Sequence, residues 1–316
     1  MNNHSRWLHR YAIFVAISTA VLLYWGGLVT STGSGLAVPD WPLSYGMLMP
    51  PMVGGIFYEH GHRMVATFVG LLTIILAMWL HKSEERRWLR ILGWMALGTV
   101  IFQGILGGIT VLFFLPLPVS VFHATLAQTF FCITLAIALF TSRFWKESIP
   151  HSIEPQKGSI RTITTVLVAI VFIQLIIGAI MRHMEAGLAI PDFPLAFGRI
   201  IPPIESVDVL VHFAHRLGAV AVTVAVLWYI MHVYKYYSTV KAFSIPAIAL
   251  IILLVVQVTL GAYVIWSGKA VAITTFHLVT GALLLGTSAI AAMLSFRLVK
   301  PEKEKVMLTA TPQQAQ

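Results

Sequence analysis

The chain has 316 residues, of which 58% are hydrophobic and only 10% are charged, and its mean hydropathy is +0.85. This composition excludes an ordinary soluble domain and indicates a protein that lies mostly within a membrane. The single cysteine, Cys132, excludes an intrachain disulfide and a thiolate metal site.

Eight apolar stretches are long enough to cross a bilayer. A helix needs roughly 20 mostly apolar residues to span the hydrocarbon core, where its backbone groups must pair internally. The predicted spans cover residues 11–30, 64–80, 91–113, 120–141, 162–181, 210–234, 244–266 and 272–296. We therefore predict an all-α membrane protein.

Basic residues are distributed unevenly between the two sets of segments that flank these spans. The net charge is +9, and most of the 21 Lys and Arg residues fall on the side that holds both termini. The exceptions are Arg63, Arg182, Arg199, Arg216 and Lys269. Because basic loops remain on the cytoplasmic side, the pattern predicts that both termini are cytoplasmic. The charge thus favours a role in orientation among membrane lipids over nucleic-acid binding.

A twelve-residue sequence occurs twice. Residues 35–46 read Gly-Leu-Ala-Val-Pro-Asp-Trp-Pro-Leu-Ser-Tyr-Gly, and residues 187–198 read Gly-Leu-Ala-Ile-Pro-Asp-Phe-Pro-Leu-Ala-Phe-Gly. The likeness continues in register through four spans of each half. Since four is an even number, both halves enter the membrane in the same direction, which indicates a parallel repeat.

The repeat predicts two tandem, pseudo-symmetric four-helix bundles, related by an axis along the membrane normal. The expected boundaries are 1–145 for the N-terminal bundle, 146–160 for a cytoplasmic linker, 161–300 for the C-terminal bundle and 301–316 for a cytoplasmic tail. The linker is inferred from its content of Ser, Pro, Lys and Glu. Two proline-bracketed loops, 39–42 and 191–194, are expected to be stiff caps over the outer mouths of the bundles.

Four histidines recur in the duplicated register, although histidine is uncommon in membrane helices. His62 and His215 lie at the start of the second span of each half, and His123 and His277 near the start of the fourth. Alternate helices of a four-helix bundle face each other across its core, so each half presents two imidazoles at one depth. Two opposing imidazoles are typical axial ligands of a heme iron. A four-histidine metal site without heme stays open, but it requires the two halves to converge.

Two arginines follow the histidines that begin the second span of each half. Arg63 and Arg216 lie at the outer boundary, where the propionates of a heme would reach water. A guanidinium group pairs with a carboxylate through two parallel hydrogen bonds, so both residues are candidates for propionate binding. The alternative is an interfacial arginine that extends its head to lipid or water.

Glu59 occurs in the first half only, because the corresponding residue before His215 is His212. A spacing of three residues on a helix brings Glu59 and His62 onto one face, so Glu59 would approach the edge of the macrocycle that His62 holds. A carboxylate there acts as a base or stabilises developing positive charge. The alternative is a solvated glutamate, which is favourable near the N-terminus of a helix.

Further polar residues lie close to these positions. Gln103 and Gln257 occupy equivalent places in apolar spans, and we expect them to form interhelical hydrogen bonds. His60 and His183 lie in outer segments, and His60 is a competing candidate ligand that lacks a repeat counterpart.

Together these motifs resemble the heme A synthase family. The likeness rests on Glu59-x-x-His62-Arg63, on His123, His215-Arg216 and His277, and on the duplicated loops, and it covers nearly the whole chain. The resemblance implies an enzyme that oxidises the C8 methyl group of heme O to a formyl group, with water as the oxygen source, for cytochrome oxidase assembly. It also implies a bacterial cytoplasmic membrane as the location.

The resemblance further assigns the two halves. The C-terminal half would hold a heme B cofactor through His215 and His277, and the N-terminal half would receive heme O between His62 and His123, with Glu59 as the catalytic residue. A heme O synthase and an electron acceptor are the implied partners. Many bacterial members carry cysteine pairs in the outer loops, whereas this sequence has none there.

Two other classes of function compete with this assignment. A diheme bis-histidine cytochrome b, linked to quinone, would hold two permanent and equivalent hemes, and the presence of Glu59 in one half only argues against it. A transporter built on a parallel repeat would place its substrate groups near the bilayer midplane, whereas the repeated histidines lie toward the outer face.

Overall fold

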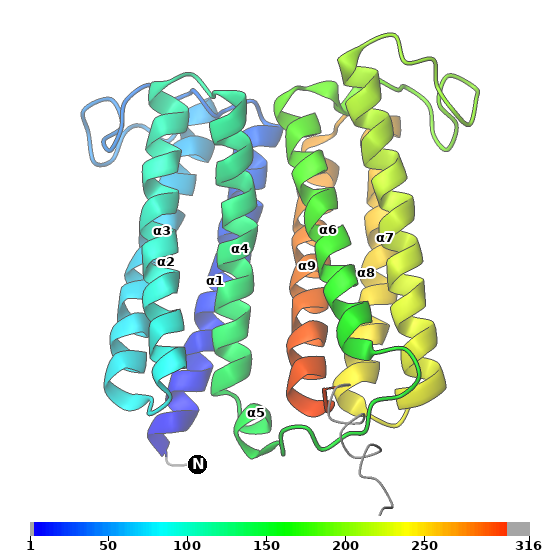
Figure 1. The fold of residues 1–316 in the computed structure, drawn as a ribbon. Helices are drawn as coiled ribbons and strands as arrows, with labels where there is room; N and C mark the ends of the chain where they lie inside the picture. The colour runs from blue at the N-terminus through cyan, green and yellow to red at the C-terminus, as the bar shows by residue number, and fades with distance from the viewer. Residues whose placement is uncertain (1–2, 302–316) are drawn as a thin grey trace, which may run out of the picture.

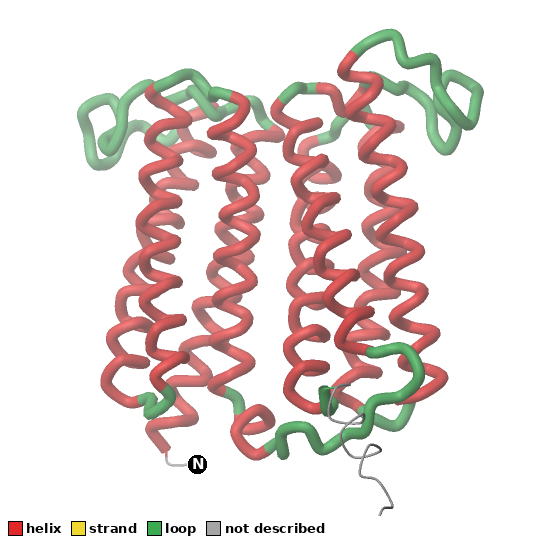
Figure 2. Tube along the Cα trace, in the orientation of Figure 1, coloured by secondary structure: helices red, strands yellow, loops and turns green. Residues whose placement is uncertain are grey.

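The computed structural model describes residues 3–301, which form eight long helices and two short ones (Figures 1 and 2). The long helices are α1 (Asn3–Ser31), α2 (Gly54–Ser83), α3 (Arg87–Leu112), α4 (Leu117–Thr141), α6 (Ile160–His183), α7 (Val207–Tyr237), α8 (Lys241–Trp266) and α9 (Val271–Leu298). The short ones are α5 (Arg143–Glu147) and the 3-10 helix η1 (Ala186–Leu188). Each long helix includes a span apolar enough to cross a membrane, which confirms the predicted all-α membrane protein with eight spans.

The start of α2 differs most from the prediction. The helix begins at Gly54, whereas its apolar stretch begins only near residue 64. Hydropathy misses the first turns because they are polar, but Glu59 and His60 are buried there and bind the preceding loop. His62 therefore lies within α2 and not at its first residue.

The helices of each half pack as a closed ring. In the first half α1, α2, α3 and α4 contact one another in chain order, and α4 returns to α1; α6, α7, α8 and α9 repeat this order in the second half. Figure 1 shows the two groups side by side. Helices α2 and α4 are thus diagonal partners, as are α7 and α9, so residues on their inner faces point across one bundle.

The two halves meet through α1, α4, α6 and α9. Helix α1 packs against α9, α4 packs against α6, and α4 and α9 also contact each other. Leu23, Phe131 and Ala282 form a small apolar cluster at this contact. An axis that exchanges α1 with α6 and α4 with α9 would reproduce this set of contacts. The symmetry and the domain boundaries stay predictions.

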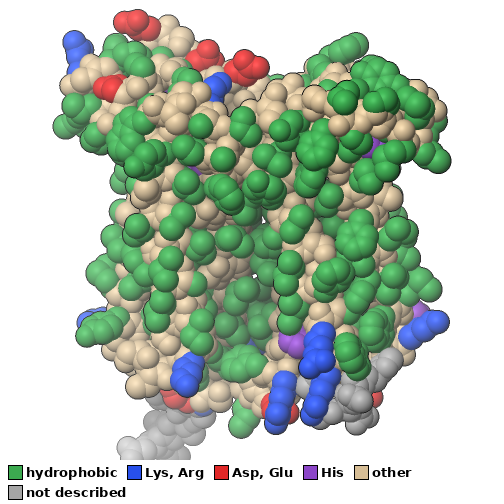
Figure 3. Space-filling view, turned by 180° about the vertical axis from the view of Figure 1, so that it is seen from behind, with side chains coloured by type: hydrophobic (Ala, Val, Ile, Leu, Met, Phe, Trp, Pro, Cys, Tyr) green, Lys and Arg blue, Asp and Glu red, His purple; other side chains and the backbone are tan. Residues whose placement is uncertain are grey.

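We call inner the end where α1 begins and α9 ends, and outer the end that carries loops 32–53 and 184–206. Apolar side chains cover the flanks between the ends, and Ile17, Met231 and Val255 are 58%, 62% and 59% exposed (Figure 3). Such a surface suits contact with lipid. Basic side chains gather mainly at the inner end in Figure 3, and residues 302–316 of the predicted tail lie outside the described residues.

Candidate functional site

The four repeated histidines lie at matching places along their helices. His62 and His215 are equally far from the first residues of α2 and α7, and His123 and His277 are equally far from those of α4 and α9. All four helices begin at the outer end (Figure 1). Because an α-helix rises by a constant distance per residue, the members of each equivalent pair lie at similar depths below that end.

His215 and His277 approach each other across the second bundle. Their ring centroids are 6.4 Å apart, and the ring planes are inclined by 68°. A metal held by two opposing imidazole nitrogens at about 2 Å each would separate the ring centroids by about 6 Å. The spacing of this pair therefore fits axial ligation of one iron. His62 and His123 hold the corresponding places on α2 and α4.

A glycine of the preceding helix faces each of the four rings. An added Cβ atom would lie 3.1 Å from Cε1 of His62 at Gly26, 3.5 Å from Cε1 of His123 at Gly107, 3.0 Å from Cε1 of His215 at Gly178 and 3.2 Å from Cε1 of His277 at Gly261. The distances at Gly26, Gly178 and Gly261 would crowd the ring, so glycine permits the close approach there, whereas the distance at Gly107 is an ordinary contact. The repeat matched Gly107 with Gly261, but the sequence analysis assigned no role to any of the four glycines.

Two of the rings also contain a buried nitrogen without a partner. Among residues 3–301, Nδ1 of His62 and Nδ1 of His123 have no hydrogen-bond partner. A buried polar atom without a partner is unfavourable and indicates a role beyond packing. The glycine contacts and the unpaired nitrogens together fit a site in which imidazoles ligate the iron of a flat, apolar macrocycle.

Glutamine residues contact three of the histidines. Gln103 donates to the backbone carbonyl of His123 at 2.7 Å. The side-chain amide nitrogen of Gln257 lies 3.3 Å from Nε2 of His277. These contacts confirm the predicted interhelical hydrogen bonds. Gln174, which the sequence analysis missed, reaches His215; the shared spacing of Gln103-x-x-x-Gly107, Gln174-x-x-x-Gly178 and Gln257-x-x-x-Gly261 was the available signal.

Arg63 and Arg216 hold the proline-bracketed loops. Arg63 donates to the backbone carbonyls of Val38, Asp40 and Leu43 at 3.2, 2.7 and 2.8 Å. Arg216 donates to those of Ile190, Asp192 and Leu195 at 3.2, 2.7 and 2.7 Å. The contacts of both arginines thus tie a loop to its helix, and propionate binding stays a prediction.

Glu59 is 4% exposed and turns its carboxylate to the loop. Oε1 accepts a hydrogen bond from Arg63 at 2.6 Å, and Oε2 accepts one from the backbone N–H of Val38 at 2.8 Å. In the second half, the backbone N–H of Ile190 donates to Nδ1 of His212 at 3.2 Å. Glu59 and His212 therefore anchor equivalent residues of the two loops, a role that the sequence analysis did not assign.

The aspartate of each loop closes a tight turn. Asp40 accepts hydrogen bonds from the backbone N–H groups of Gly46 and Tyr45 at 2.8 and 2.6 Å, and these bonds hold the pKa of Asp40 below its ordinary value. Asp192 accepts equivalent bonds from Gly198 and Phe197 at 2.8 and 2.7 Å. Hydrogen bonds to the aspartates thus add to proline as a reason to expect stiff loops.

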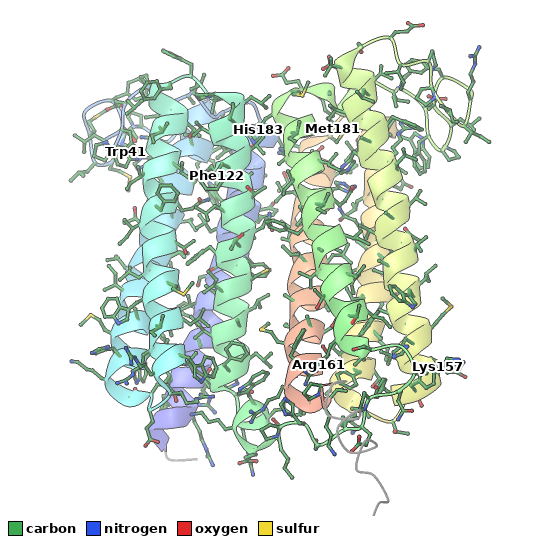
Figure 4. The ribbon with its side chains drawn as sticks, in the orientation of Figure 1. Trp41, Phe122, Lys157, Arg161, Met181 and His183 are labelled. Carbon is green, nitrogen blue, oxygen red and sulfur yellow. The ribbon has the colours of Figure 1, made fainter. Side chains whose placement is uncertain are left out.

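The first loop also packs on α3. Atom Cδ2 of Trp41 would lie 2.7 Å from a Cβ atom added at Gly108, and Figure 4 shows Trp41 beside the outer end of α3. Both loops project sideways from the outer end in Figure 1, away from the junction of the halves. The loops therefore extend beside the outer ends of the bundles and not over their mouths, where we expected them.

The remaining histidines near the outer end have separate surroundings. Nδ1 of His60 lies 2.8 Å from Oγ of Ser44, and His183 ends α6 on the side that faces α4 (Figure 4). Within the described part of the chain, no three His, Cys, Asp or Glu side chains gather closely enough to hold a metal ion. A metal site made of all four repeated histidines therefore gains no support.

Comparison with known proteins agrees with this geometry. The family model described as cytochrome oxidase assembly protein (COX15-CtaA) matches residues 9–289. A heme A synthase of Symbiobacterium thermophilum is 33% identical over 225 residues, which cover 66% of this chain and 71% of the relative. Heme A synthases of Alkalihalophilus pseudofirmus and Halalkalibacterium halodurans are each 28% identical and cover 87% and 92% of this chain, and 92% and 98% of their own lengths. The chain belongs to this family of cytochrome oxidase assembly proteins, the heme A synthases.

Proposed function

We propose that this chain is a membrane-bound oxidoreductase of heme A biosynthesis that converts heme O to heme A. The names of its relatives support the reaction. The structural observation that carries the proposal is the pair of rings at His215 and His277, spaced for one iron, with a second pair at His62 and His123. Two histidine pairs allow one bound cofactor and one bound substrate.

The finer proposal concerns the chemistry at the substrate. The C8 methyl group of heme O is oxidised to a formyl group, and water supplies the oxygen. One methyl group and one water molecule give one formyl group, four protons and four electrons. Two successive hydroxylations of the same carbon, followed by loss of water, account for this stoichiometry.

The two halves have different roles in this proposal. His215 and His277 hold a heme B cofactor, which supplies one-electron transfer when bound. His62 and His123 receive heme O. The asymmetry at Glu59 supports this division, because the half that carries out chemistry has the extra ionisable group.

Three residues at the outer end complete the proposed site. Glu59 serves as a base or stabilises positive charge on the substrate, and each of its oxygens retains a lone pair beyond the bonds to Arg63 and Val38. Arg63 and Arg216 bind propionates. In the second half this is supported by Nε of Arg216, which is buried and has no partner among residues 3–301.

The surroundings of the enzyme are part of the proposal. It lies in the bacterial cytoplasmic membrane with both termini inside, which the basic side chains at the inner end support. A heme O synthase delivers the substrate, and an electron acceptor outside the chain receives the electrons.

Pigment analysis tests the reaction. The protein is expressed with and without a supply of heme O, and the extracted hemes are identified by mass. We expect an alcohol or aldehyde derivative only when heme O is supplied, and its loss in His62→Ala and Glu59→Ala. Full conversion in both variants would refute the site. Two identical, non-exchanging hemes B without conversion would identify a diheme cytochrome b instead.

A further inference from the structure

The helix that precedes each axial histidine carries a short motif opposite the ring. On α3, α6 and α8 the motif is a glutamine followed four residues later by the glycine that contacts the ring; on α1 the glutamine is replaced. The four motifs are Gln103/Gly107, Gln174/Gly178, Gln257/Gly261 and Leu22/Gly26. Only His62 therefore faces a motif without an amide.

The two rings of the C-terminal bundle are held by these helices. Nδ1 of His277 lies 3.1 Å from the backbone carbonyl oxygen of Gln257, which can accept its proton. Nε2 is then the nitrogen that would bind iron, in place of its 3.3 Å contact with the side-chain amide of Gln257. The side-chain amide nitrogen of Gln174 lies 3.1 Å from Nδ1 of His215 and donates to the backbone carbonyl of His215 at 2.8 Å.

The amide of Gln174 also offers an acceptor for the form of His215 that binds iron. Ligation through Nε2 leaves a proton on Nδ1, and this proton needs a partner. Oε1 of Gln174 is buried and has no partner among the described residues, and a half-turn of the amide would bring it to Nδ1. Gln174 therefore serves either protonation state of the ring.

The bundle makes room for Gln174 at a single glycine. A Cβ atom at Gly218, one turn after His215 on α7, would lie 1.8 Å from Oε1 of Gln174. The equivalent residue after His62 is Val65. Leu22 and Val65 both pack against the apolar core of the N-terminal bundle. A polar Gln/Gly pair in one half thus corresponds to an apolar Leu/Val pair in the other.

The imidazole rings of the N-terminal bundle, those of His62 and His123, have fewer hydrogen bonds. Gln103 binds the backbone carbonyl of His123 and not its ring, while Oε1 of Gln103 and Nδ1 of His123 are buried without partners within residues 3–301. Nδ1 of His62 is also unpaired there, and no amide lies at its register. His215 and His277 therefore have the most hydrogen bonds from the preceding helix to their rings, His123 has such a bond only at its backbone, and His62 has none among the described residues.

We propose that Gln174 is a positioning residue that fixes His215 as a permanent axial ligand. Leu22 and Val65, in contrast, leave His62 as the weakest of the four ligands, and the bond from His62 is the one that forms and breaks when the substrate heme binds and leaves. This inference rests on the proposed function, which assigns the cofactor to the C-terminal half. Hydrogen bonds to the second nitrogen of a ligating histidine fix its orientation and raise its basicity, and their loss typically lowers metal affinity by about 10- to 100-fold.

Gln174→Met tests the first part, because methionine fills a similar volume and has no amide. The C-terminal site is isolated in the full-length holoprotein by a His62→Ala, His123→Ala background. We expect heme transfer to excess apomyoglobin to accelerate about 10- to 100-fold and carbon monoxide to bind the reduced heme. Gln174→Glu, which keeps an acceptor oxygen, should restore slow transfer. Wild-type transfer and no carbon monoxide binding in Gln174→Met would overturn the assignment.

The reverse exchange tests the second part and does not depend on the folding of the first variant. Leu22→Gln combined with Val65→Gly installs the missing amide beside His62, and its N-terminal site is isolated by His215→Ala and His277→Ala. We expect heme transfer from this site to slow by about 10- to 100-fold. Leu22→Met with Val65→Gly is the matched control, since it opens the same space without an amide. Equal rates in the two variants would refute the role of Leu22.

These measurements separate the inference from the proposed function, because neither heme transfer nor carbon monoxide binding requires conversion of heme O. If heme O is not converted but heme is transferred at the expected rates, the proposed reaction is refuted and the difference in hydrogen bonding between the histidine ligands is retained. Intact conversion with unchanged transfer rates would overturn the inference alone.

Discussion

Glu59 and Arg63 form an ion pair whose side chains are 5% and 16% exposed. Removal of one partner of a buried pair leaves an uncompensated charge, which costs about 3–5 kcal/mol. We therefore expect Arg63→Ala to lower the free energy of unfolding by about that amount, whereas Arg216→Ala leaves no buried carboxylate unpaired and costs less. Thermal unfolding in detergent measures both. Equal losses would show that the ion pair contributes nothing.

Glu59 is expected to have a chemical role besides its role as a loop anchor, and Glu59→Gln distinguishes the two. Glutamine keeps an acceptor for the backbone N–H of Val38 but has no charge and no basic oxygen. We expect the variant to retain bound heme and to lose heme O conversion by about 100-fold or more, as is typical for a general base. Glu59→His, which copies His212, is the matched control for anchoring. Full conversion in Glu59→Gln would leave Glu59 as an anchor only, whereas conversion in Glu59→His would not, because imidazole can itself act as a general base.

At the residue scale, the repeat was enough to single out the four histidines that pair across the bundles. Histidine is rare in membrane helices, so its recurrence at equivalent positions of the two halves indicates a shared role. The partners of Arg63 and Glu59 could not be predicted in the same way. They are backbone groups of a loop, and sequence spacing on a helix says nothing about which loop atoms fold back onto it. Gln174 was missed because its counterpart, Leu22, is apolar.

At the element scale, hydropathy located all eight spans but not the start of α2. The first turns of that helix are polar, and tertiary contacts with the loop compensate for their low hydropathy. The helical turn η1 and the short helix α5 also lacked a signal, since neither shows an apolar period. Proline predicts stiff outer loops, whereas nothing in the sequence predicted their sideways direction or the contact of Trp41 in the first loop with Gly108.

The hydrogen bonds of the outer loops predict a dependence on pH. Donation by Gly46 and Tyr45 lowers the pKa of Asp40 below its ordinary 3.8, so its contribution to loop stability is present above that value and is lost as the pH falls through the lowered pKa. We expect the first loop to resist pepsin at about pH 4–5 and to become sensitive near about pH 2. Because the activity of pepsin itself changes over this range, cleavage of the wild type is compared at each pH with that of Asp40→Asn, which has no charge to lose; we expect the ratio of the two to rise near about pH 2. A ratio that does not change with pH would refute the role of Asp40.

At the scale of the whole molecule, three spans, an odd number, separate loop 32–53 from the linker, which predicts that the two lie on opposite sides of the membrane. Because Cys132 is the only cysteine, Cys132→Ala provides a cysteine-free background. Leu48→Cys, at a site 86% exposed, should react with a membrane-impermeant maleimide on intact cells. Lys157→Cys in the linker should react only after permeabilisation. The opposite pattern would invert the orientation.

The contact between the halves was beyond prediction, because it depends on particular side chains at particular helix faces. Arg182 donates from α6 to the carbonyl of Gly27 and to Oγ of Ser31, both on α1, at 2.9 and 2.7 Å. Gly286 of α9 allows Leu135 of α4 to approach within 2.5 Å of the place of a Cβ atom. The repeat predicted that two bundles exist, and these contacts determine how they join.

The common depth of the equivalent histidines has an energetic consequence. Under the proposed assignment, an electron that passes between the two halves travels parallel to the bilayer surface and crosses almost none of the voltage across it. Full passage through the membrane would involve about 2.3 kcal/mol at 100 mV. Internal electron movement should therefore proceed at the same rate in energised and in uncoupled cells.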